Sequence, residues 1–217
     1  MFIDIHSHHH ALSNEQWVIK NLYNYFEQVE SQGKYSIGLH PWYIDEVSWH
    51  IEFDKLQRFA TNNFVVAIGE CGLDKNCKID LLLQKKIFTA HVILANKLNK
   101  PLIIHCVNAY QEIKQILKAN KINVPVIFHG FNRNEHIAKA LIKEGCFLSF
   151  GKALLKENIK ILVRKISLEN IFLETDNDTI TIEEIYSMTE RILSVDTETL
   201  QLQIKKNAIR IFGDGLF

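Results

Sequence analysis

Short apolar runs that end in a histidine or a carboxylate recur along this chain of 217 residues. A short apolar run between helical stretches is typical of a buried parallel strand. The polar residues at the ends of these runs are His6 with His8, Glu70, His105, His129 and Asp176. If the strands share one sheet, we expect these side chains to gather at its C-terminal edge, where α/β proteins place their chemistry.

The order of strands and helices predicts the fold class. Strands are expected over residues 2–6, 17–23, 34–40, 64–70, 101–105, 126–129, 146–151 and 171–176. Apolar residues at helical spacing predict helices over residues 80–98, 110–120, 134–145, 158–165, 182–193 and 198–212. The gap between the second and third strands holds at most about two helical turns. We therefore predict an α/β protein, a compact (β/α)8 TIM barrel with a shortened second βα unit.

The composition fits a single globular domain over residues 1–217. Hydrophobic residues make up 47% of the chain, which excludes a disordered protein. The 25 basic and 25 acidic residues cancel, so the net charge argues neither for nor against a polyanionic partner. No apolar run is long enough to span a membrane, and the first strand begins too early to leave room for a signal peptide. We expect a cytoplasmic monomer with no membrane partner.

The first expected strand ends in a pattern that suits a metal ion. Asp4, His6 and His8 are spaced by two residues, so on an extended strand they point to one face and present two imidazoles together. Glu70 follows a fully apolar strand, where a carboxylate without a partner or a metal ion would be costly to desolvate. His9 and His10 are expected to be loop residues.

The chemistry of the strand-end residues indicates the kind and number of ions. The set contains four imidazoles and two carboxylates, which suit Zn, Mn, Fe or Ni better than Mg or Ca. Six ligands are too many for one closed tetrahedral zinc and match two ions that share Glu70. Two divalent ions bring a charge of +4 and the carboxylates of Glu70 and Asp176 return −2, so +2 remains. This residual charge favours an anionic ester such as a phosphodiester.

The strand ends also carry recognisable motifs. They are DIHSH (4–8), GLHPW (38–42), GECGLD (69–74), PLIIH (101–105), FHGF (128–131) and LETD (173–176). In this order they resemble the motifs of TatD-like metal-dependent hydrolases, a branch of the amidohydrolase superfamily. Each motif alone is weak, but the combination is highly specific and covers nearly the whole chain.

The resemblance implies a TIM barrel with two divalent metal ions, which could be Zn, Mn, Ni, Fe or Mg. By motif position, one ion would be bound by His6, His8 and Asp176, the other by His105 and His129, and both by Glu70. Asp176 would also take a proton from the attacking water, so Asp176 and Glu70 are the expected catalytic residues. The implied activity is hydrolysis of phosphodiester bonds by a deoxyribonuclease, including exonuclease action, on DNA or a small phosphodiester.

Two segments depart from the family pattern and leave alternatives for the substrate. Residues 105–108 read His-Cys-Val-Asn where the family usually has His-Ser/Thr-Arg-Asp, so an arginine that could assist phosphate binding is missing. The segment 177–179 leads quickly into a helix, and this shortened loop is expected to open or reshape the cleft. The alternatives are a hydrolase of a carboxylic ester, amide or lactone, and a non-catalytic scaffold that has kept a metal site.

Three further polar residues are candidates for supporting roles. His40 ends another expected strand, and two interpretations stay open, contact with the substrate or orientation of its loop. Asp74 is expected to help hold the loop after Glu70. Gln84, at the start of the next helix, is either a supporting residue of the site or an ordinary surface residue.

Overall fold

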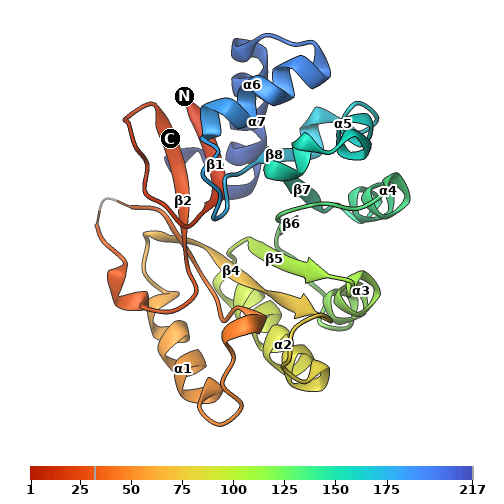
Figure 1. Ribbon diagram of the computed structural model, residues 1–217. Helices are drawn as coiled ribbons and strands as arrows, with labels where there is room; N and C mark the ends of the chain where they lie inside the picture. Colours follow the sequence, from red (N-terminus) through yellow and green to blue (C-terminus); the bar gives the residue numbers. More distant parts are fainter. Residues whose placement is uncertain (32, 217) are drawn as a thin grey trace. The chain divides into compact units, whose positions relative to one another are not determined.

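In the computed structural model, which describes residues 1–31 and 33–216, eight short strands alternate with helices along the chain (Figure 1). The chain forms two compact units, which we call unit 1 (Met1–Lys20 and Ile127–Phe217) and unit 2 (Asn21–Val126). In both units the paired strands run parallel, and each strand from β3 onward is followed by a helix, whereas β1 leads directly into β2. The parallel βα units expected from the sequence are therefore present.

Unit 1 contains both ends of the chain. Its strands are β1 (Phe2–Ser7), the first part of β2 (Gln16–Leu22), β6 (Val126–Phe128), β7 (Phe147–Phe150) and β8 (Ile171–Leu173). Its α-helices are α4 (Glu135–Lys143), α5 (Glu157–Val163), α6 (Ile182–Leu193) and α7 (Thr197–Phe212). β1 pairs with β2, and β7 pairs with both β6 and β8. A parallel bridge between Ser7 and Asp176 joins the end of β1 to the segment that follows β8.

Helix α6 holds the beginning of β1 in unit 1. The Tyr186 hydroxyl accepts the backbone N–H of Ile3 at 3.0 Å and donates to the Ile3 carbonyl at 3.3 Å. The ring of Tyr186 also packs edge-on against Phe2, with 5.1 Å between ring centroids. Ile3 and Ile5 are fully buried, so the apolar face of β1 lies in the core while its far end carries the polar residues.

Unit 2 is centred on the longest strand. Its strands are β3 (Tyr35–Ile37), β4 (Val65–Asp74) and β5 (Leu102–Val107), and its α-helices are α1 (Trp49–Phe59), α2 (Leu81–Leu98) and α3 (Tyr110–Ala119). Every residue of β4 is buried, as expected for a parallel strand that is covered on both faces. β4 pairs with β5 as far as Asp74 and Val107, beyond the end at residue 70 that we expected. Gly72 permits this close pairing, because a Cβ there would collide with the carbonyl oxygen of His105.

Several details differ from the sequence-based expectations. Helix α1 was not predicted, because only Phe53 and Leu56 of its residues are buried and its apolar stripe is short. Between β2 and β3 the described residues form only the 3-10 turn η1 (Phe26–Gln28), as expected for a shortened second unit. The assignment of the whole chain to one domain stays a prediction. Among the described residues, no helix has the length and apolar character that a membrane crossing requires.

Candidate functional site

Three of the predicted ligands meet at the end of β1 in unit 1. Ring nitrogens of His6 and His8 and a carboxylate oxygen of Asp176 lie within 4.8 Å of one another. Asp176 Oδ1 is 3.6 Å from His6 Nε2 and 3.5 Å from His8 Nε2. The His6 side chain is fully buried, whereas the Asp176 side chain is 46% exposed. Two imidazoles and a carboxylate that remains accessible form a donor set suited to a divalent metal ion with an open coordination position.

Backbone hydrogen bonds fix Asp176 against β1. Its N–H donates to the carbonyl oxygen of His6 at 2.9 Å, and its own carbonyl accepts the N–H of His8 at 2.9 Å. The backbone dihedral angle φ of Asp176 is 54°, which lies in the left-handed region that aspartate tolerates better than most residues. The two hydrogen bonds stabilise this conformation, so the main chain itself directs the carboxylate toward the imidazoles.

The neighbouring histidines outweigh burial in setting the pKa of Asp176. Burial acts to raise this pKa, but the imidazoles of His6 and His8 and the charge of nearby His129 lower it well below its ordinary range. The Asp176 carboxylate is therefore ionised at neutral pH, which is the form that binds cations and accepts protons.

A second carboxylate, Asp4, ties β1 to the segment that carries Asp176. Asp4 Oδ2 accepts the hydroxyl of Thr175 at 2.6 Å, and Asp4 Oδ1 accepts the N–H of Thr175 at 3.2 Å. The Thr175 hydroxyl also lies 2.8 Å from Ser7 Oγ. Burial raises the pKa of Asp4 to about 7, although the hydrogen bonds from Thr175 oppose this rise. Asp4 therefore supports the ligand group through Thr175, while its carboxylate oxygens face Thr175 instead of the imidazoles.

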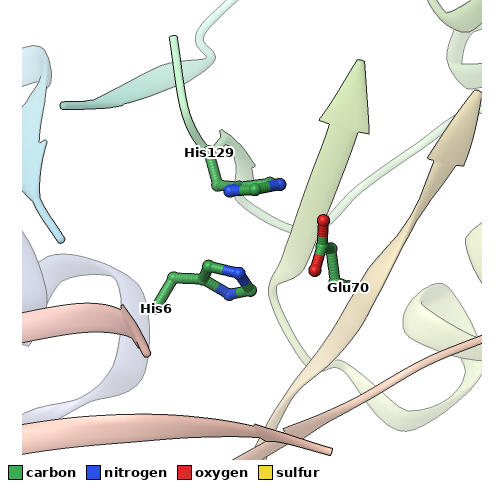
Figure 2. A group of neighbouring side chains, drawn as sticks. All are labelled: His6, Glu70 and His129. Atoms are coloured by element: carbon green, nitrogen blue, oxygen red, sulfur yellow. The ribbon is translucent and has the colours of Figure 1, made fainter. Parts of the chain in front are cut away.

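His129, which follows β6, lies beside His6 in unit 1 (Figure 2). The two ring centroids are 4.3 Å apart. Glu174 Oε1 lies 3.5 Å from His129 Nδ1 and accepts the N–H of Gly130 at 2.7 Å. A carboxylate beside a histidine ring nitrogen is the usual device that orients a metal-binding imidazole. Glu70, the third residue labelled in Figure 2, belongs to unit 2 and is described with it.

An open cleft of about 540 Å³ adjoins Asp176 in unit 1. It is lined by Gly130, Asn132, Gly151, Lys152, Ala153, Leu155, Lys156, Glu174, Thr175, Asp176, Asn177 and Asp178. Within it, Lys152 Nζ lies 2.7 Å from Asp178 Oδ2. The short segment after Asp176 therefore forms part of the wall of a cleft that reaches the ligand group.

In unit 2, Glu70 is surrounded by polar side chains. Glu70 Oε1 lies 3.1 Å from His40 Nε2 and 3.0 Å from His105 Nδ1. The side-chain NH2 of Asn21 donates to Glu70 Oε2 at 3.1 Å, and the side-chain oxygen of Asn21 accepts the backbone N–H of Glu70 at 3.0 Å. Donor atoms of His40, Glu70 and His105 lie within 4.8 Å of one another, so they form a second candidate metal group.

Asp74 supports the other side of His105. Its Oδ2 lies 3.2 Å from His105 Nε2 and accepts the indole N–H of Trp42 at 2.6 Å. Burial acts to raise the pKa of Asp74, but hydrogen bonds from Trp42, Asn76 and His105 lower it below its ordinary value. Gln84 accepts the N–H of Asp74 at 2.8 Å and donates to its carbonyl at 3.1 Å. Gln84 is buried, so it is a support of this segment and not a surface residue.

His40 begins the 3-10 turn η2 (Pro41–Tyr43). Its Nδ1 accepts the N–H of Trp42 at 3.1 Å. When Nδ1 of a neutral imidazole accepts a hydrogen bond, the ring proton is on Nε2. In His40, Nε2 is the atom that faces Glu70. In this tautomer His40 donates to Glu70 and at the same time fixes the start of the turn.

Each unit thus brings together part of the predicted set. Unit 1 gathers His6, His8, Asp176 and His129, and unit 2 gathers Glu70, His105 and His40. The roles that the resemblance assigns to these residues stay predictions. Two supporting residues were not predicted, Asn21, which contacts Glu70, and Glu174, which contacts His129. Both lie at the end of an expected strand, and that position was the available signal.

Comparison with known proteins gives a consistent result. Residues 8–213 match the family model described as TatD related DNase. An uncharacterized metal-dependent hydrolase of Buchnera aphidicola subsp. Baizongia pistaciae is 33% identical over 147 residues, 65% of this chain and 55% of that protein. A 3'-5' ssDNA/RNA exonuclease TatD of Pantoea ananatis is 38% identical over 82 residues, 37% of this chain and 31% of that protein. The matches therefore span from about a third to little more than half of the length of these relatives.

The fold has a counterpart among solved structures. The crystal structure of YJJV, a TatD homolog from Escherichia coli k12, matches with a TM-score of 0.82 and 18% identity over 97% of both chains. A likeness at this identity shows the fold, and it confirms the (β/α)8 barrel class expected from the sequence.

Proposed function

The chain belongs to the TatD related DNase family, and on this premise we propose that it is a metal-dependent hydrolase that cleaves phosphodiester bonds in DNA. The observation that carries the proposal is the group of His6, His8 and Asp176, which offers two imidazoles and an ionised carboxylate at an open cleft. The names of the relatives, a metal-dependent hydrolase and a 3'-5' ssDNA/RNA exonuclease, support the proposal and favour exonuclease action.

The side chains present fit divalent metal ions. Imidazole nitrogens and carboxylate oxygens are ligands for Zn, Mn, Fe and Ni, and carboxylates also accept Mg. One ion would be held by His6, His8 and Asp176. The second would be held by His105 and His129, with Glu70 shared by both ions, and this part of the proposal rests on the family resemblance alone.

The mechanism that we propose divides the work between the ions and the protein. Bound divalent ions would lower the pKa of a water molecule toward ~7 and polarise the phosphoryl oxygen. Asp176 would accept the proton of the attacking water on its carboxylate, because that carboxylate remains accessible beside the two imidazoles. Glu174 and Asn21 would keep His129 and Glu70 in position through the contacts described above. Substrate orientation would come from the residues that line the cleft.

Charge supports an anionic substrate. Two divalent ions bring +4, and Asp176 with Glu70 return −2, so +2 would remain at the centre. A phosphodiester neutralises part of this charge, whereas a neutral amide or lactone does not. DNA, or a smaller phosphodiester, is therefore the proposed substrate. We also propose, from the sequence, a monomer located in the cytoplasm.

A second function is favoured by one departure from the family pattern. Residues 105–108 read His-Cys-Val-Asn, without the arginine that the family usually carries there. Without this arginine the site has less positive charge, so it would accept a carboxylic ester, an amide or a lactone more readily than a site that carries the arginine. This alternative uses the same ligand residues and differs from the first only in the bond that is broken.

A substrate panel separates the two functions. The protein is purified without chelator, its metal content is measured, and it is supplied in turn with single-stranded DNA, a phosphomonoester, a carboxylic ester, an amide and a lactone, each with added Mn or Zn. We expect release of nucleotides from DNA at the highest rate. Faster turnover of the ester, amide or lactone would favour the alternative. Protein that binds the metals but turns over none of these substrates would favour a non-catalytic scaffold.

A further inference from the structure

Two large aromatic side chains stand exposed directly after His40 in unit 2. Trp42 is 56% exposed and Tyr43 is 60% exposed, and both belong to the short turn η2. Single exposed aromatic residues are ordinary on protein surfaces. Two adjacent ones beside a group of candidate metal ligands are a feature that the fold alone does not require.

Both rings are held in place even though they are exposed. The indole N–H of Trp42 donates to Asp74 Oδ2 at 2.6 Å. The ring of Tyr43 stacks on that of Tyr23, with centroids 4.7 Å apart and an angle of 27° between the planes. A ring that is fixed before binding loses little conformational entropy when a ligand stacks on it. Trp42 and Tyr43 are therefore preorganised to receive a flat ligand.

The two rings lie close to the ligand group of unit 2. The Trp42 centroid is 5.1 Å from that of His40 and 5.9 Å from that of His105. The Tyr43 centroid is 5.5 Å from that of His40. A base that stacks on either ring would therefore lie close to a phosphate at the ligand group.

We propose that Trp42 and Tyr43 form a stacking platform that positions an unpaired nucleobase next to the cleaved phosphodiester. The inference rests on the proposed function and adds the residues that position the strand. Every base has a π-face, so such a platform binds different sequences alike. It requires an unpaired base, because the faces of bases in a duplex are already covered by their neighbours.

Binding tests the platform without turnover. The metal-loaded protein is titrated with a fluorescently labelled single-stranded phosphorothioate, which resists hydrolysis, and with an abasic strand of the same length and charge. We expect the strand with bases to bind more tightly, and Trp42→Ala to weaken its binding about 5-fold to 150-fold. Trp42→Phe keeps an aromatic face without the indole N–H and should retain most of the affinity.

Intrinsic fluorescence adds a direct readout of contact. The chain has three tryptophans, of which Trp17 is buried and Trp42 is exposed. We expect the strand with bases to quench the fluorescence of the wild-type protein, and this quenching to persist in Trp49→Phe and to be lost in Trp42→Phe. Equal affinity for both strands, or a Trp42→Phe variant as impaired as Trp42→Ala, would overturn the platform. In the latter case the hydrogen bond to Asp74, and not stacking, would explain the effect of Trp42.

Kinetics distinguish a failure of this inference from a failure of the proposed function. Natural phosphodiester strands with and without bases are supplied to the wild-type protein and to Trp42→Ala. We expect Trp42→Ala to lower kcat/KM for the strand with bases by a larger factor than for the abasic strand, because only the strand with bases can stack on the ring. If the wild-type protein cleaves both strands equally and Trp42→Ala changes neither rate, the platform is wrong and the hydrolase stands. If the wild-type protein cleaves neither strand with any metal, the proposed function fails.

Discussion

The backbone N–H of Asp176 donates to the carbonyl oxygen of His6 at 2.9 Å. The N–H of His8 returns a hydrogen bond of the same length to the carbonyl of Asp176. Because these bonds use the main chain, the three candidate ligands keep their relative positions as long as residue 176 tolerates the left-handed backbone. Side-chain substitutions in this group therefore change its chemistry more than its geometry.

Asp176→Asn tests the proton acceptor. Asparagine has nearly the same size and also tolerates the left-handed backbone, so we expect an intact fold. Without an ionisable carboxylate, the rate of nucleotide release from DNA should fall by about 10²- to 10⁴-fold. The same substitution at the exposed residue Asp54 on α1 serves as the control and should leave the rate unchanged. A wild-type rate for Asp176→Asn would remove Asp176 from the mechanism.

Glu174→Gln tests the support of His129. A glutamine oxygen can still accept the N–H of Gly130, but a neutral amide orients the imidazole less firmly than a carboxylate does. We expect the affinity for Mn or Zn, measured by equilibrium dialysis, to fall by about 10- to 100-fold. Glu169→Gln, at an exposed position in the same unit, should bind the metals as the wild-type protein does. Equal affinities in all three proteins would show that Glu174 does not support a ligand.

The strands could be predicted because the information is local. Each apolar run that follows a helical stretch identified a strand, and all eight expected strands are found among the described residues. Helix α1 was missed because its buried face consists of Phe53 and Leu56 alone, so its periodicity is weak. The extension of β4 to Asp74 was missed because it depends on pairing with β5, which the sequence of β4 does not reveal.

The candidate ligands could be predicted, but their supports could not. A histidine or carboxylate at the end of an apolar run is visible in the sequence itself. The contact of Asn21 with Glu70 joins β2 to β4, and the contact of Asp4 with Thr175 joins β1 to the segment that follows β8. Which polar side chain reaches which ligand depends on strand register and side-chain direction, which follow from the packed structure. The aromatic platform depends in the same way on how Tyr43 meets Tyr23.

Tyr186→Phe tests how α6 holds β1. The substitution removes the hydroxyl that bonds the N–H and the carbonyl of Ile3, and leaves these buried groups without that partner. We expect the free energy of unfolding, measured by urea denaturation, to fall by about 1–3 kcal/mol. Tyr25→Phe, at a side chain that is 64% exposed, is the matched control and should be neutral. A wild-type stability for Tyr186→Phe would mean that packing alone positions β1.

His91→Gln tests a buried histidine in unit 2. His91 Nε2 accepts the N–H of Leu39 at 2.9 Å, and burial lowers the pKa of His91 from 6.5 to about 4. Below pH 6.5 the unfolded chain binds a proton that the folded chain does not. His91 therefore contributes its full stability above this pH and loses about 1.4 kcal/mol per pH unit as the pH falls toward about 4.

Glutamine keeps an acceptor for Leu39 and does not titrate. We therefore expect the difference in unfolding free energy between pH 7 and pH 5, measured with urea, to be smaller in His91→Gln than in the wild-type protein. His50→Gln, at an exposed position on α1, should keep the wild-type pH dependence. Identical pH dependence in His91→Gln and the wild-type protein would show that the pKa of His91 is the same in the folded and the unfolded protein.

The most direct test of a metal-dependent phosphodiesterase is metal removal and return. The protein is stripped with EDTA, dialysed, and mixed with end-labelled single-stranded DNA before and after Mn or Zn is restored and its content measured. We predict no release of nucleotides from the stripped protein and recovery of release as the metal content rises. Release that EDTA leaves unchanged, or no release from protein that has regained its metal, would contradict the proposed function.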